Sequence, residues 1–439
     1  MSYLVEDCLR IIFIELKYVP NSLYSCILVN RFWCIIGVQI LWEKPYEFLL
    51  NHRSLKKAYH IRNYEILQFI KFYNTIIDLL PTSSKQLLIE NNVISISTPF
   101  LNKPLFNYIS FSSEISPNLI NEMGLGLIEE SICSNKYQEK YKILEQEYYK
   151  LFINNCKNIT NFRWNTSLPL YQYPGASTCF SQLRTLVAPG LIKFIDNQKI
   201  LQSLYLHNSI KGERKSIQLS ETIEKKAVTL KRFSLENVLL SLKFLPSLIN
   251  LEQLKLKLEN YCYLSEKDWK KYLLIASFPK LQYLKAQYLP PHGVCRLIEN
   301  SQNIKEIDTL NNFRGRCCGV KEIILNCNKL KKLDICLNFE DDDGDDHERE
   351  TICDEVLNYL LNYSPRNFDE FAFNENWRFS VNNLKKFFEG WRGRKPIKFI
   401  TRFDRCYHFT KEHVEIVQKY YDEGVIDKNT SFLYGVNDY

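Results

Sequence analysis

Cysteine and histidine are the first residues to consider for chemistry in this chain, because both can ligate metals. There are 14 cysteines and 7 histidines in 439 residues, and no two cysteines form a CxxC pair. The close groupings are Cys406, His408 and His413, with His292 and Cys295 elsewhere. Structural zinc needs four ligands in a recognisable spacing. None is present, so we expect no metal site.

The sequence EDDDGDDHERE at 340–350 concentrates carboxylates and invites a calcium interpretation. Four of its residues match positions 3, 5, 6 and 12 of an EF-hand loop, namely Asp341, Asp343, Gly344 and Glu350. Position 1 would be Phe339, which cannot ligate, and a strand-like segment stands where the entering helix should be. We therefore interpret 340–350 as a solvated acidic loop. Its local charge of −7 within an overall charge of +7 leaves +14 on the rest of the chain.

Catalytic signatures are missing from the sequence. It contains no GxGxxG, GxxxxGK[ST], HExxH or GxSxG motif. Glycine is scarce, with 14 in the chain, which leaves few positions for phosphate-cradling loops. We expect a protein that is not an enzyme and needs no cofactor.

A basic segment favours a nucleic-acid alternative. Residues 391–405, WRGRKPIKFITRFDR, carry six basic groups and three aromatic residues. Such a composition could hold phosphates and stack bases. Nothing in the chain resembles an RNA-recognition or helix-turn-helix signature, so a solvated face is the favoured interpretation.

Composition argues against widespread disorder and against a membrane span. Apolar residues make up 45% of the chain and charged residues 24%, as in ordinary globular proteins. The longest apolar stretch, 27–42, contains Asn30, Arg31 and Gln39, and a bilayer-crossing helix needs about 20 mostly apolar residues. The N-terminal MSYLVED has two acids where a secretory signal needs positive charge. The acidic N-terminus and the scattered cysteines together predict that the protein resides in a reducing compartment, the cytoplasm or the nucleus.

An internal repeat determines the predicted architecture. Apolar triples spaced LxxLxL recur from residue 159 onward, with a mean period of roughly 26 residues that suits leucine-rich repeats. They start at Ile159, Leu183, Leu201, Leu230, Leu251, Leu281, Ile304, Leu330, Phe368 and Ile397. The second and third apolar residues lie two apart, so they point to the same side of a short strand. Stacked units of this kind bury a continuous core, with helical segments such as 268–280 forming the opposite layer.

Three helices are predicted in the first 45 residues. Leu9, Ile12, Phe13 and Leu16 share one face of a first helix, which has two acids in its first turn. A second helix starts near Leu23, after Pro20-Asn21-Ser22. Asn30 is expected to cap a third helix that runs to about Val38. Residues 46–150 are predicted to form a mainly helical connector, with an irregular stretch at 82–117.

Residues 4–42 resemble an F-box, a three-helix module of about 45 residues. The residues that carry the resemblance are Leu4, Ile12-Phe13, Leu28-Val29-Asn30-Arg31-Phe32-Trp33 and Leu41-Trp42. The chain departs from the pattern at Val5, where the family usually has proline. The arrangement as a whole resembles the fungal-type F-box/leucine-rich-repeat proteins.

The resemblance implies a substrate-recognition subunit of an SCF-type (cullin–RING) ubiquitin ligase, whose F-box binds a Skp-type adaptor and whose repeats bind a substrate protein. The candidate adaptor-binding residues are Leu4, Val5, Ile12, Phe13, Leu16, Leu28, Val29, Trp33, Leu41 and Trp42. Some of them must instead fill the core of the module. A ligase-independent interaction scaffold would show the same sequence and stays an alternative.

The candidate substrate-binding residues stand between inward-facing strand positions, where they would line the concave face of the repeats. They are Tyr205, Ser234, Lys255, Lys285, Asp308, Asp334 and Thr401. The predicted fold is thus α/β: an F-box at 1–45, the connector at 46–150, and an irregular leucine-rich-repeat solenoid at 151–439. Its short parallel strands lie on the concave side and its helices outside.

Overall fold

The computed structural model describes most of the chain. The described residues are 6–17, 19, 22–47, 62–94, 104–157, 159–188, 192–207, 213–237, 240–257, 266–289, 291–314, 318–338, 346–373, 377–401, 410–428 and 430. The chain divides into two compact units. The first comprises Met1–Val187 and Asn197–Leu201, and the second Ala188–Asp196 and Gln202–Tyr439.

Helices dominate the first unit. They are α1 (Glu6–Leu16), α2 (Ser22–Ile27), α3 (Arg31–Glu43), α5 (Arg62–Asp78), α6 (Thr82–Glu90), η1 (Tyr108–Phe111), α7 (Pro117–Leu127), α8 (Asn135–Asn155), η2 (Leu170–Gln172) and α9 (Ala176–Cys179). The three N-terminal helices form as predicted, but α3 continues beyond Val38 to Glu43. It ends before Lys44-Pro45 because a residue that precedes proline is disfavoured in helical conformation. The stretch at 82–117, expected to be irregular, contains α6 and η1.

Eleven strands follow one another in chain order, β1 to β11. They are β1 (Glu114–Ile115), β2 (Asn161–Arg163), β3 (Thr185–Ala188), β4 (Ser203–His207), β5 (Arg232–Glu236), β6 (Gln253–Lys257), β7 (Tyr283–Gln287), β8 (Glu306–Arg314), β9 (Lys332–Asn338), β10 (Glu370–Phe373) and β11 (Lys398–Thr401). Each of the ten predicted triples coincides with one strand from β2 to β11. The pairing is parallel from β1 to β3 and from β4 to β11, so the predicted α/β repeat fold is confirmed. The strand β1 was not predicted, because two residues are too short for a pattern.

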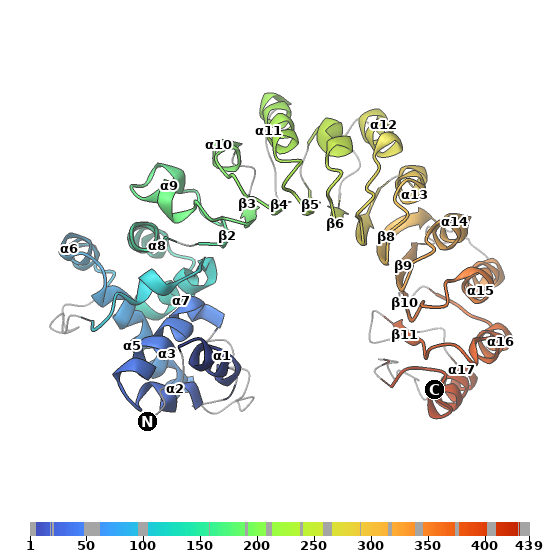
Figure 1. Ribbon diagram of the computed structural model, residues 1–439, viewed down its shortest axis with the longest axis horizontal. Coiled ribbons are helices and arrows are strands. Elements are labelled where there is room, and N and C mark those ends of the chain that lie inside the picture. The colour runs from blue at the N-terminus through green and yellow to red at the C-terminus, as the bar shows by residue number, and fades with distance from the viewer. Residues whose placement is uncertain are drawn as a thin grey trace. The chain divides into compact units, whose positions relative to one another are not determined.

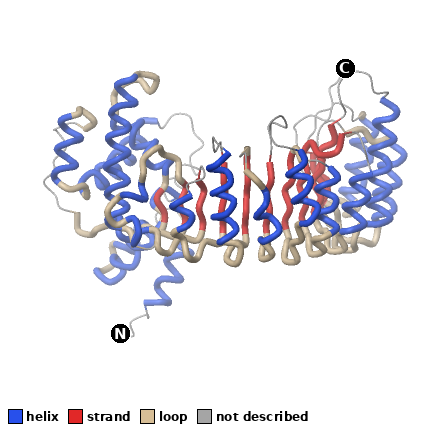
Figure 2. Tube along the Cα trace, turned by 90° about the horizontal axis from the view of Figure 1, so that it is seen from above, coloured by secondary structure: helices blue, strands red, loops and turns tan. Residues whose placement is uncertain are grey.

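Helices alternate with the strands along the chain in the second unit. In space they form an outer layer over a curved strand layer (Figure 1). They are α10 (Ile192–Asp196), α11 (Glu213–Lys225), η3 (Leu242–Ser247), α12 (Glu266–Ile275), α13 (Pro291–Glu299), α14 (Cys318–Asn326), α15 (Asp346–Tyr363), α16 (Val381–Trp391) and α17 (Lys411–Asp422). Figure 2 shows the helices standing side by side against the strands. This is the two-layer arrangement that the sequence predicted.

Buried and more exposed residues alternate along the strands of the second unit, and the buried ones form its core. Leu204 and Leu206 of β4 are buried, while Tyr205 between them is partly exposed. The same alternation recurs in β6, where Leu254 and Leu256 are buried on either side of Lys255. Burying a leucine side chain stabilises the fold by roughly 1.5 to 3 kcal/mol, so stacked strands supply a continuous apolar core.

Candidate functional site

The three N-terminal helices enclose a small core of their own. Its buried residues come from all three helices: Leu9, Phe13, Leu23, Ile36 and Ile40. Leu16, Trp33 and Leu41 are partly buried and pack against this core. The Phe13 and Trp33 rings meet edge to face at 5.3 Å, a favourable aromatic geometry. These side chains hold α1, α2 and α3 together.

Asn30 forms the junction between α2 and α3. Its backbone is extended, and its side-chain Oδ1 accepts a hydrogen bond from the Trp33 backbone N–H at 2.9 Å. This satisfies one of the N–H groups that a helix start leaves without a partner. The predicted cap is confirmed, and it fixes where the Trp33 ring enters the core.

Large apolar side chains remain exposed on this small module. They are Ile11, Ile12, Ile14, Tyr24, Leu28, Val29, Phe32 and Ile35, and we call this set the apolar surface. Leu28 is 70% exposed and Val29 is 59% exposed. Single exposed hydrophobic residues are normal on a soluble protein, but a concentration of them marks an interaction site.

Nine of the ten candidate adaptor-binding residues fall into three groups. Ile12, Leu28 and Val29 belong to the apolar surface. Phe13 is fully buried, so its side chain serves the core instead, together with the partly buried Leu16, Trp33 and Leu41. Leu4 and Val5 lie outside the described residues.

Sequence reasoning missed other members of the apolar surface. Ile11 and Ile14 lie three apart on α1 and are exposed, as are Phe32 and Ile35 on α3. A helical projection shows that these residues share a second apolar face, at i and i+3 off the core stripe, but not that this face stays exposed. Ile12, which the projection placed on the core stripe, is 44% exposed.

Trp42 has a different environment from the other candidates. Its ring stacks on Phe72 of α5, with centroids 4.9 Å apart, and on Tyr108 of η1, with centroids 4.8 Å apart. The Ser112 hydroxyl donates to the Trp42 carbonyl at 3.0 Å, and the Ser113 N–H donates to the Glu43 carbonyl at 2.9 Å. Trp42 therefore joins the end of α3 to the rest of the first unit.

In the second unit, six of the seven candidate substrate-binding residues form one row across the strands. Pairing places Tyr205 beside Ser234, Ser234 beside Lys255, and Lys255 beside Lys285. The row continues from Lys285 to Asp308 and from Asp308 to Asp334. We call the strand face that carries this row the inner face.

Thr401 does not belong to this row, which corrects the sequence register at β11. Thr401 pairs with Phe373, while Ile400 pairs with Ala372 and Ala372 with Asp334. The expected apolar positions were Ile397 and Ile400, but Phe399 is the buried residue of the strand. Its ring packs against the Phe373 ring at 4.8 Å, and this contact sets the register.

Several charges on the inner face are paired. Lys285 Nζ lies 2.7 Å from Asp308 Oδ2, and Lys257 Nζ lies 3.0 Å from Glu236 Oε1. Lys255 Nζ lies 5.4 Å from the centroid of the Tyr283 ring, within cation–π range. The inner face thus mixes paired charges, hydroxyls and aromatic rings, as polar recognition surfaces do.

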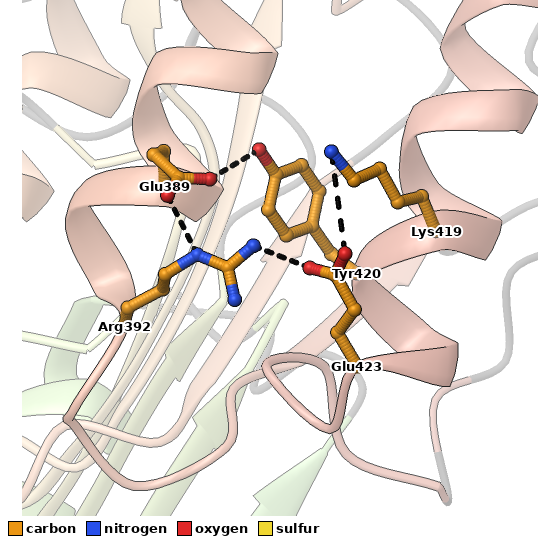
Figure 3. Close-up of polar contacts among 5 residues, drawn as sticks. All are labelled: Glu389, Arg392, Lys419, Tyr420 and Glu423. Atoms are coloured by element: carbon orange, nitrogen blue, oxygen red, sulfur yellow. Dashed lines mark hydrogen bonds and ion pairs between the residues drawn. The ribbon is translucent and has the colours of Figure 1, made fainter.

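The basic side chains at 391–405, which favoured the nucleic-acid alternative, mostly form hydrogen bonds and ion pairs with other side chains of this chain. Arg392 Nε donates to Glu389 Oε1 at 2.7 Å, and Arg392 also pairs with Glu423 (Figure 3). The Tyr420 hydroxyl donates to Glu389 Oε2 at 2.8 Å, and Lys419 Nζ lies 4.0 Å from Glu423. Hydrogen bonds from Arg392 and then Tyr420 lower the pKa of Glu389.

Its other described cations are engaged as well. Arg394 donates to the Ser364 hydroxyl at 2.9 Å and lies over the Trp391 ring. Lys395 pairs with Asp369, and Lys398 Nζ lies 3.9 Å from a carboxylate oxygen of Glu370. Arg402 and Arg405 lie outside the described residues. Phosphate binding by Arg392, Lys395 or Lys398 would compete with these ion pairs.

We next consider metal binding and cysteine reactivity in the described part of the chain. No group of three or more His, Cys, Asp or Glu side chains there could hold a metal ion. The residues Cys406, His408, Asp341, Asp343 and Gly344 lie outside it. Burial raises the pKa of Cys327 and of Cys353 to about 12, so both stay protonated at neutral pH and are poor nucleophiles.

His413 is described, and its ring is held by neighbouring groups. Its Nδ1 accepts a hydrogen bond from the Thr410 N–H at 3.1 Å, and its Nε2 lies 2.7 Å from the Phe379 carbonyl. Both ring nitrogens are thereby used in capping α17 and fixing it to a neighbouring segment. The helices described here include none long and apolar enough to cross a bilayer.

Comparisons with known proteins give only distant similarities. No protein-family model matches the chain, and no curated protein does. Among solved structures, the leucine-rich-repeat-containing protein LegL7 from Legionella pneumophila is 12% identical, with a TM-score of 0.39, over 63% of this chain and 94% of its own. Rad7, solved in complex with Elc1 from yeast, is 12% identical, with a TM-score of 0.33, over 62% of this chain and 56% of its own.

Proposed function

We propose that this chain is the substrate-recognition subunit of an SCF-type ubiquitin ligase. In this proposal the three N-terminal helices dock on a Skp-type adaptor, and the inner face holds a substrate protein. The observation that carries the proposal is the apolar surface. It is exposed on a module that already has its own core, and it includes Leu28 and Val29, which are part of the F-box pattern.

Energetics favour this use of the apolar surface. Fully burying one valine or leucine side chain stabilises an interface by roughly 1.5 to 3 kcal/mol. A few well-placed anchors dominate most protein interfaces, so Leu28, Val29 and Phe32 could supply much of the affinity.

The proposed mechanism is positioning rather than catalysis. A bound substrate is held near a ubiquitin-charged conjugating enzyme that sits elsewhere in the ligase, which raises the effective concentration of its lysines. No side chain of this chain has to take part in bond formation.

A pull-down with the Skp-type adaptor tests the proposal. We expect Leu28→Asp with Val29→Asp to abolish adaptor capture, because both carboxylates would be buried against apolar groups. The matched control is Leu125→Asp with Ile132→Asp, which changes two similarly exposed apolar residues of the same unit outside the module.

The outcome separates the candidate functions. Wild-type chain that captures neither adaptor nor cullin would overturn the proposal and leave the ligase-independent scaffold. Equal capture by the Leu28/Val29 variant and the wild type would show that the apolar surface is not the docking site.

A further inference from the structure

Two cations stand on neighbouring strands of the inner face. Arg232 is the first residue of β5, and Lys255 is the central residue of β6. Ser234 pairs directly with Lys255, and Arg232 pairs with Gln253 two residues earlier. Adjacent strands lie about 4.8 Å apart, so the backbones of Arg232 and Lys255 are diagonal neighbours. Their charged groups reach to opposite sides, toward Ser203 on β4 and Tyr283 on β7.

Within the described residues these two cations lack carboxylate partners. Arg232 is exposed, and its Nε donates to the Ser203 hydroxyl at 2.6 Å, which leaves its terminal N–H groups for another acceptor. Lys255 contacts the Tyr283 ring instead of a carboxylate. Their neighbours differ, because Lys257 and Lys285 are neutralised by ion pairs. Two positive charges without a carboxylate partner among the described residues therefore stand on the inner face between β4 and β7.

This arrangement suits a ligand that carries more than one anionic group. Arginine binds carboxylate or phosphoryl oxygens through a planar fork of N–H donors, and lysine adds a point charge. Ser234 supplies a hydroxyl donor beside Lys255. Because the Arg232 Nε is already bonded to Ser203, the guanidinium is oriented before any ligand arrives, which lowers the entropic cost of binding.

The surrounding row sets the size of the ligand. From Tyr205 on β4 to Lys285 on β7 the row crosses three strand intervals, or about 14 Å. An extended peptide covers that distance with four to five residues at about 3.3 Å each. Tyr205 and Tyr283 offer aromatic surface on either side of the cations.

We infer that the inner face over β4–β7 binds an extended acidic peptide segment, with its anionic groups on Arg232 and Lys255. This inference rests on the proposed function only in treating that segment as part of the substrate. Arg232 was not among the residues that the sequence singled out, because the repeat pattern directed attention to the strand centres.

Selection from a random dodecapeptide phage library against the full chain tests the inference. We expect the recovered peptides to be enriched in Asp and Glu. The strongest peptide is then synthesised with a fluorophore, and its affinity is measured by anisotropy. Arg232→Glu and Lys255→Glu should each weaken binding about tenfold or more, as expected for a lost charge-assisted hydrogen bond.

A matched control separates a local site from general charge. Lys193 and Lys243 are exposed on outer-layer helices of the same unit, and Lys193→Glu with Lys243→Glu makes the same change in net charge. We expect this double variant to bind the peptide like the wild type. Recovered peptides without acidic enrichment would overturn the inference, as would equal losses in the control and in the Arg232/Lys255 double variant.

Two further measurements complete the test. The selected peptide is made with Asp, phosphoserine or serine at its acidic positions, which distinguishes a carboxylate ligand from a phosphoryl ligand, and equal binding of the serine form would refute an anion site. The Arg232/Lys255 double variant is also tested for adaptor capture, which it should retain. Failure of adaptor capture by the wild type would remove the proposed function and leave the peptide site standing.

Discussion

Asn30 shows how one side chain sets the direction of the backbone in the N-terminal module. Its side chain caps α3 by accepting from the Trp33 N–H, and Trp33 packs on Phe13 in the core. The sequence could predict this cap, because asparagine is unfavourable inside a helix and favourable at its start. It could not predict which apolar residues stay exposed, since α1 and α3 are apolar on more than one face.

At this scale we predict the effect of removing the cap. Asn30→Ala should destabilise the module by about 1 kcal/mol, because an N–H of the first turn of α3 loses its acceptor. Hydrogen exchange of the amides near Trp33 measures the loss. Asn30→Asp keeps the acceptor and should keep the protection. Unchanged exchange in the alanine variant would contradict a capping role.

At the scale of the element, strands were easier to predict from the sequence than helices. The spacing of each triple reflects the side-chain period of a strand, so every strand from β2 to β11 was found. The register failed at β11, because the neighbouring Phe399 and Ile400 are both apolar and packing against Phe373 decides which of the two points inward.

In the candidate site, too, side-chain alternation was predictable from the sequence and contacts between strands were not. The row from Tyr205 to Asp334 was predictable because it alternates with buried residues. The lack of carboxylate partners for Arg232 and Lys255 among the described residues was not predictable, because it depends on contacts with Ser203 and Tyr283 on other strands.

Helix α3 leads to a second prediction, which concerns Trp42. Trp42→Ala should destabilise the first unit by about 2 kcal/mol, less than the roughly 3 to 5 kcal/mol for a fully buried aromatic residue, because the stacks on Phe72 and Tyr108 are lost. The unfolding midpoint measures this loss. Trp42→Phe should retain most of the stability, because it keeps an aromatic ring between the same partners.

Adaptor affinity distinguishes two roles for Trp42, which are attaching α3 to the first unit and contacting the adaptor directly. If the ring serves to attach α3, the folded Trp42→Ala chain should bind the adaptor nearly as well as the wild type does. A loss as large as that of the Leu28/Val29 variant, with no change in the unfolding midpoint, would mean that Trp42 contacts the adaptor directly.

At the scale of the whole molecule, stacked repeats make stability a matter of nearest neighbours. The last repeat therefore needs a cap, and α17 has the composition of one. Its buried residues are His413, Val417 and Tyr420, while most of its other positions are polar and exposed. The segment after α17 also pairs with the strand layer, since the Ile397 N–H donates to the Val425 carbonyl at 3.0 Å.

Ending the chain at residue 409 should therefore unravel the last repeats and spare the central ones. The Tyr420 ring would no longer cover Phe388, which lies 5.4 Å away between centroids, and Ile397 would lose its partners. Hydrogen exchange should show lost protection in α16 and β11, with β5 to β7 unchanged because each repeat contacts only its neighbours. Arg392→Ala in the full chain removes the exposed ion pairs with Glu389 and Glu423 and the contact with the Tyr420 ring. It should leave the pattern intact, because exposed ion pairs contribute little to stability. Uniform loss of protection across all strands of the truncated chain would mean that the array unfolds as one cooperative unit.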